Sequence, residues 1–140
     1  MGSVLPVAEV IAPVDAEAAV VAGLKAAYLS RGMTVKVGTK VPNPMPSAVV
    51  RVSLVDSARI TLLHHQASIL VECWADSESA ASDLARTTYA LIFALEGEEV
   101  GGKWVAQVTE MGGVVNFADL DAGVPRYQFT VDLLIAGELI

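Results

Sequence analysis

The segment from Ser68 to Asp76 constrains the fold more than any other part of this chain. It reads Ser-Ile-Leu-Val-Glu-Cys-Trp-Ala-Asp, and this alternation is typical of a strand whose two faces differ in environment. An alanine-rich stretch with helical spacing follows at once. Asp76 or Ser77 can cap a helix there, which we expect to run to about Leu95. The segment therefore predicts a sheet strand joined directly to a helix that packs on the sheet.

The rest of the chain supplies a second helix and more strands. Asp15 can cap a helix that runs to about Arg31, and Gly32 is a good residue to end it. Strands are expected at 33–41, 48–55, 59–63, 104–110 and 126–135, and loops at 42–46, 98–102 and 117–124. We therefore expect an α+β fold, with a mixed or antiparallel sheet of about four to five strands and two helices on one face. Residues 1–140 are expected to form a single domain with a flexible N-terminus, about residues 1–13.

The chain is unusually apolar. Hydrophobic residues make up 54%, and the mean hydropathy is +0.54. The longest apolar runs, such as Tyr89 to Leu95, are far too short to span a bilayer, and Met1 to Ala12 lacks the basic start of a signal peptide. Two explanations stay open at this point. The excess apolar surface is buried in a core or in subunit interfaces, or small Ala and Val side chains merely raise the mean hydropathy.

Charge is distributed unevenly along the chain, which has a formal net charge of −7. Residues 1–70 hold six Lys/Arg and four Asp/Glu, whereas residues 71–140 hold three and twelve. An acidic chain is poorly suited to wrapping nucleic acid, because such binding depends on cations that neutralise phosphates. The charge is compatible with a surface past which DNA moves without binding.

The single cysteine, Cys73, excludes an intrachain disulfide framework and fits a reducing cytoplasm. Cys73 alternates in phase with Val71 and Ala75, so we expect a buried structural thiol and not a nucleophile.

The polar residues give no catalytic or metal-binding pattern. His64 and His65 are adjacent, and adjacent strand residues face opposite sides, so we expect ordinary surface or loop histidines and not a metal site. Glu96, Glu98 and Glu99 lie in a glycine-containing turn and are simplest as a solvated loop. The glycines of that turn precede a strand and not a helix, so they make no phosphate cradle. We expect no enzyme activity and no cofactor.

Large apolar residues fall on the second face of the predicted sheet. Leu70 and Trp74 alternate out of phase with Cys73, and Leu134 lies opposite the face that carries Tyr127. They are the candidate subunit interface, because apolar side chains on a sheet face without helices need cover from elsewhere. The alternative is that one chain covers both faces locally.

Taken together, several motifs resemble the tail terminator family of long-tailed (siphovirus-type) bacteriophages. They are Tyr28-Leu29 in the first helix, Val41 to Pro46 leading into Val49 to Val52, the strand Leu70 to Ala75, Ala80-Ala81 and Leu84-Ala85 in the second helix, Gly112-Gly113, Asp119 in a loop, and Pro125 to Val131. The resemblance covers about residues 15–135.

This resemblance implies a viral structural protein that is not an enzyme. Such α+β subunits assemble into a homo-oligomeric ring, typically a hexamer. The ring caps the tail tube built by the major tail tube protein, stops its polymerisation and forms the joining surface to the head-side connector or stopper protein. DNA passes through the lumen without specific binding, and no membrane is involved. The expected location is the head-proximal end of the virion tail, after assembly in the host cytoplasm. Another phage neck or head-tail joining protein is the closest alternative, and a small-molecule-binding α+β domain is a more distant one.

Overall fold

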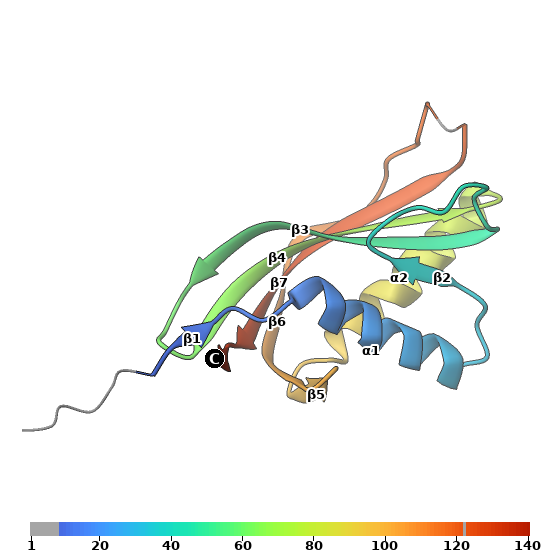
Figure 1. Ribbon diagram of the computed structural model, residues 1–140. Coiled ribbons are helices and arrows are strands. Elements are labelled where there is room, and N and C mark those ends of the chain that lie inside the picture. Colours follow the sequence, from blue (N-terminus) through green and yellow to red (C-terminus); the bar gives the residue numbers. More distant parts are fainter. Residues whose placement is uncertain (1–8, 122) are drawn as a thin grey trace, which may run out of the picture.

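The computed structural model describes residues 9–121 and 123–140. One long, strongly curved sheet lies over two helices that cover only one of its faces (Figure 1). The α+β class and the position of both helices on one face are therefore confirmed.

Six strands form the main sheet, in the order β2-β3-β4-β7-β6-β5. Their bounds are β2 Lys36–Gly38, β3 Ala48–Arg59, β4 His64–Ala75, β5 Glu98–Val100, β6 Lys103–Asn116 and β7 Arg126–Ala136. β2 runs parallel to β3, and all other pairs are antiparallel. Ser68 to Ala75, predicted as a strand, lie in β4, which together with β7 forms the centre of the sheet.

The two helices begin at the predicted caps. α1 spans Ala16–Ser30, and the Asp15 side chain accepts a hydrogen bond from the backbone of Ala18. α2 spans Glu78–Phe93, and Ser77 caps it in the same way. Gly32 follows α1 with a φ of 69°, a conformation that glycine adopts at low cost.

The core lies between these helices and the covered face of the sheet. Tyr28 of α1 and Thr88 of α2 share a buried hydrogen bond of 2.5 Å, which ties the helices to each other. Fully buried apolar side chains fill the space around it: Val20, Leu24, Ile92, Val50, Val52, Ile69, Val71, Cys73, Phe129, Val131, Leu133 and Ile135. Each of the Val, Leu, Ile and Phe side chains contributes roughly 1.5–3 kcal/mol relative to an exposed position.

The sheet has more strands than the predicted four to five. The turn expected at 98–102 contains β5, a short strand that folds back on β6. The separate strand expected at 59–63 is wrong, because β3 continues to Arg59 and residues 60–63 are the turn into β4. The strand expected at 33–41 shrinks to the three residues of β2.

A second, two-stranded sheet joins the two ends of the described chain. β1 (Ile11–Ala12) pairs antiparallel with β8 (Glu138–Leu139). Gly137 precedes β8, and a Cβ there would meet the carbonyl of Ala12 at 2.8 Å, so glycine permits the close approach. The flexible N-terminus was expected over about residues 1–13. Residues 1–8 lie outside the described part of the chain, whereas Ile11 and Ala12 form β1.

Candidate subunit interface

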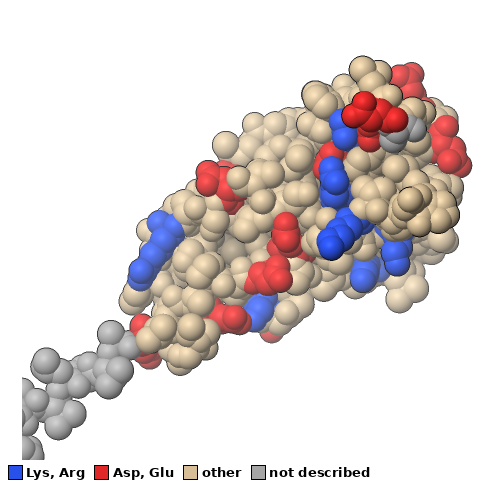
Figure 2. All heavy atoms as spheres, turned by 45° about the horizontal axis from the view of Figure 1, so that its top comes forward, with Lys and Arg blue, Asp and Glu red and all other residues tan. Residues whose placement is uncertain are grey.

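The face of the sheet opposite the helices carries the residues predicted for the interface. Leu70 and Trp74 of β4 and Leu134 of β7 all belong to this uncovered face, as the alternation of both strands requires. Leu70 and Leu134 are half-buried, so each still presents apolar surface. On the face that Figure 2 shows, Lys/Arg and Asp/Glu side chains are interspersed with uncharged surface.

Trp74 differs from the other two because the chain already covers it. Its side chain is only 2% exposed. The indole Nε1 donates to Asp119 Oδ2 at 3.1 Å, and the guanidinium carbons of Arg51 and Arg126 lie 5.4 and 5.5 Å from the ring centroid. Local cover within one chain is therefore what the structure has at Trp74. Leu70 and Leu134 stay candidates for direct contact with a neighbouring subunit.

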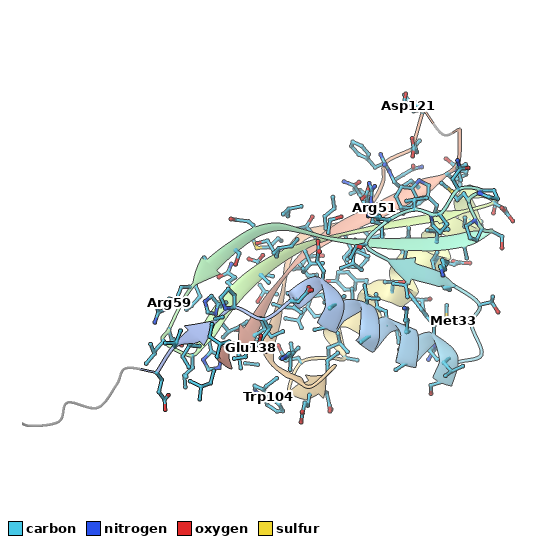
Figure 3. The ribbon with its side chains drawn as sticks, in the orientation of Figure 1. Met33, Arg51, Arg59, Trp104, Asp121 and Glu138 are labelled. Atoms are coloured by element: carbon cyan, nitrogen blue, oxygen red, sulfur yellow. The ribbon has the colours of Figure 1, made fainter. Side chains whose placement is uncertain are left out.

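A buried carboxylate organises the cover over Trp74. Glu72 is 4% exposed, and its two oxygens accept from two cations on neighbouring strands. Arg51 donates to Oε1 with Nε at 2.8 Å and lies 2.7 Å away with Nη2, and Arg126 donates to Oε2 at 3.1 Å. A buried charge is tolerated when it is paired and hydrogen-bonded in this way. Figure 3 shows Arg51 on the side of the sheet away from the helices.

Arg126 also holds the segment of residues 117–121 against the sheet. Its Nε donates to the carbonyl of Phe117 at 2.8 Å, and its guanidinium lies 5.1 Å from the Phe117 ring centroid. Asp119 lies 3.8 Å from the same guanidinium. We call Arg51, Glu72, Trp74, Asp119 and Arg126 the arginine cluster. Sequence reasoning missed it, although Glu72 on the face of Trp74 was a signal that cations were needed nearby.

The uncovered face also has a hollow over β4, β7 and β6. A hollow of about 400 Å³ is lined by Ile60, Gln66, Gln107, Thr109, Met111, Asp132 and Leu134. Asp132 is 6% exposed, accepts from Ser68 Oγ at 2.5 Å and also accepts from the Gln66 amide. Both carboxylate oxygens of Asp132 are therefore hydrogen-bonded within the sheet, which indicates a structural role.

One end of the sheet exposes a group of apolar side chains. It comprises the turn between β3 and β4 and the paired terminal segments. The Gly137 N–H donates to the carbonyl of Leu63 in the turn, and the Ile140 N–H donates to the carbonyl of Val10. Six large apolar residues there are 51–73% exposed: Val10, Ile60, Leu62, Leu63, Leu139 and Ile140. We call them the apolar end. Figure 1 shows β1, the C-terminus and the turn together at this end.

The remaining side chains with catalytic or metal-binding potential are the two histidines, Cys73 and the glutamates near β5. His64 and His65 do face opposite sides of β4. His64 is half-buried beside the turn, with Nδ1 3.2 Å from Thr61 Oγ1. His65 is buried, with Nδ1 unpaired among the residues described, so the expected surface position is wrong for His65. Cys73 is fully buried, as predicted, and burial raises the pKa of its thiol to about 12. Glu96, Glu98 and Glu99 are exposed around the β5 turn.

Within residues 9–121 and 123–140, no three His, Cys, Asp or Glu side chains are grouped so as to hold a metal ion. No helix in the same ranges is both long enough and apolar enough to cross a membrane. No protein-family model matches this chain, and no curated protein sequence matches it significantly.

Proposed function

We propose that this protein is a phage tail terminator: a structural subunit that forms a ring, caps the tail tube, stops its polymerisation and joins it to the head-side connector. The apolar end carries the proposal. Exposed apolar side chains that gather in one place mark sites of protein contact, and those of the apolar end gather where the long strands end and not on their faces.

The apolar end suits a contact that blocks addition of further tube subunits. Such a contact has to be close-packed and has to exclude water. At the opposite end of the sheet lies the hydrogen-bonded segment 117–121, in which Phe117 and Leu120 are the exposed large apolar residues. We call it the loop end. We therefore assign the apolar end to the tube and the loop end to the connector.

The test is tube length. Purified protein is incubated with polymerising tail tube subunits of the same virus, and tube lengths are measured by electron microscopy. We expect tubes to stop growing once the protein is present in excess over tube ends. Unlimited growth would overturn the terminator role. Uncapped tubes together with tight binding of the protein to connectors would indicate a neck protein instead.

A further inference from the structure

Both edges of the main sheet are only partly paired. β2 covers β3 over Val49–Arg51, and β5 covers β6 over Lys103–Val105. Beyond these short strands, the outer edges of 53–59 in β3 and 107–116 in β6 meet no other strand in the part of the chain that is described. A long open edge is a template for pairing with another strand.

The directions of the strands make these two edges fit each other. β3, β4, β7 and β6 pair antiparallel in succession, so β3 and β6 run in opposite directions. A second copy, rotated about an axis parallel to the strands, places its β3 antiparallel to β6 of the first copy. Repeated contacts of this head-to-tail kind close into a ring when the rotation is a simple fraction of a turn.

The open parts of the two edges also lie at the same level of the sheet. Ala58 pairs with Gln66, Gln66 with Leu134, and Leu134 with Gln107. In the same way Asp56 is level with Thr109, through Ser68 and Asp132. The two edges can therefore meet without a shift along the strands, over about the stretch 53–58 against 107–112.

Exposed apolar side chains occur on both edges within this stretch. Leu54 and Val55 of β3 are 42% and 55% exposed, and Met111 of β6 is 61% exposed. Glu110 and Gly112, which flank Met111, are level with Leu54 and Ser53. Leu54 is level with Ile69 on the helix side, whereas Met111 lies with Gln66 and Leu134 on the uncovered face. A neighbouring strand would cover part of each of these side chains, which favours a second copy of the chain as the occupant.

Each open edge has one backbone donor that a glutamate holds. The Leu54 N–H donates to Glu17 Oε2 at 2.7 Å, and the Val108 N–H donates to Glu96 Oε1 at 3.0 Å. Charged side chains at an edge hinder unwanted pairing. These bonds have to give way when a strand pairs there, so the two glutamates weaken association of free chains.

We propose that neighbouring copies join by antiparallel pairing of β3 from one copy with β6 of the next, which makes one continuous sheet around the ring. This inference rests on the proposed function, because the ring is the assembly that it explains.

Disulfide trapping tests the pairing. Ala58→Cys with Gln107→Cys in one chain, and Asp56→Cys with Thr109→Cys in another, put two level thiols on the uncovered face. Directly opposite strand residues have Cβ atoms about 4.5–5.5 Å apart, which is close enough for a disulfide after small shifts. Diamide is the oxidant, and Cys73 does not interfere because it is fully buried. With tube ends present, we expect a ladder of cross-linked species from dimer upward.

The matched control pairs Ser57→Cys with Gln107→Cys. Ser57 is level with Ala67 on the opposite face of the sheet, so its thiol should not cross-link to residue 107. A missing ladder in both level pairs, an equal ladder in the control, or dimers that never extend would each overturn the inference. Tube lengths measured on the same reduced variants separate the two proposals. Capping without cross-links would contradict only the edge pairing, and cross-linked rings that leave tubes uncapped would contradict only the terminator role.

Discussion

The two ends of the curved sheet differ in whether the side chains that need partners find them within the chain. At the loop end, the arginine cluster pairs a buried carboxylate with two cations and covers a tryptophan within one chain. At the apolar end, six large hydrophobic residues remain at least half exposed. The first arrangement stabilises the folded chain itself, whereas the exposed apolar surface contributes little to folding and is, under the proposed function, the surface that the tail tube covers. Mutations at the two ends should therefore separate folding stability from assembly.

The largest loss of stability is expected for Glu72→Ala. It leaves the Arg126 guanidinium, whose side chain is 14% exposed, without its main anionic partner. Breaking one partner out of a buried pair costs about 3–5 kcal/mol, and we expect roughly 3 kcal/mol because Arg51 reaches solvent. Urea denaturation measures the free energy of unfolding. Glu99→Ala, at an exposed position, is the control, and a loss below about 1 kcal/mol for Glu72→Ala would show that the cluster is dispensable.

Trp74→Phe tests the attachment of the loop and should cost less. The ring remains apolar, but the Nε1–H bond to Asp119 is lost, with an expected cost of about 1–2 kcal/mol. Hydrogen exchange in the segment 117–121 should become faster, while exchange in α1 should stay unchanged. Trp104→Phe is the matched control, because Trp104 is 48% exposed at the other end of β6. Equal exchange in both variants would mean that Trp74 does not hold the loop.

Alkaline pH probes the core that both ends share. Burial raises the pKa of the Cys73 thiol from 9.0 to about 12, so the folded state holds this proton more tightly than the unfolded state. The stabilisation that the protonated Cys73 thiol gives the folded state is complete below about pH 9 and is lost as pH rises from 9 toward 12. Burial also raises the pKa of Tyr28, in the same direction. Urea unfolding at pH 7.5 and pH 10 should show a loss of stability for the wild type that is smaller in Cys73→Val. An identical loss in both would contradict this assignment.

The smallest effect on folding is expected at the apolar end. Leu62→Ser and Ile140→Ser change side chains that are 59% and 73% exposed, so each should alter the free energy of unfolding by at most about 0.5 kcal/mol. Leu29→Ser on α1, at a residue 82% exposed, is the matched control. A loss above about 1.5 kcal/mol at Leu62 would show that this end stabilises the chain itself, and the contrast between the two ends would fail.

Local signals made much of the fold predictable. The caps Asp15 and Ser77, the alternation in β4 and the apolar side of α1 depend on neighbours a few residues away. The length of β3 was missed because residues 56–59 are exposed and polar or small, so no periodic burial marks them. β5 was missed because three residues of strand are fixed only by the hairpin they form.

The candidate interface was predicted in part, for a similar reason. Alternation placed Leu70, Trp74 and Leu134 on the uncovered face, because successive side chains of a strand point to opposite faces of the sheet. The cover over Trp74 depends on Arg51 and Arg126, which lie 23 residues before and 52 residues after it in the chain. No local pattern can show that two such distant cations meet one ring. Only the tertiary pairing of β3, β4 and β7 brings them together.

The most direct test of the account compares tube capping by the wild type, by the double variant Leu62→Ser/Ile140→Ser, and by Leu29→Ser. Tube length is measured by electron microscopy at equal concentrations of folded protein. We expect the wild type and Leu29→Ser to stop tube growth, and we expect the double variant to need at least tenfold more protein for the same effect. Capping by the double variant at the wild-type concentration would contradict the assignment of the apolar end to the tail tube.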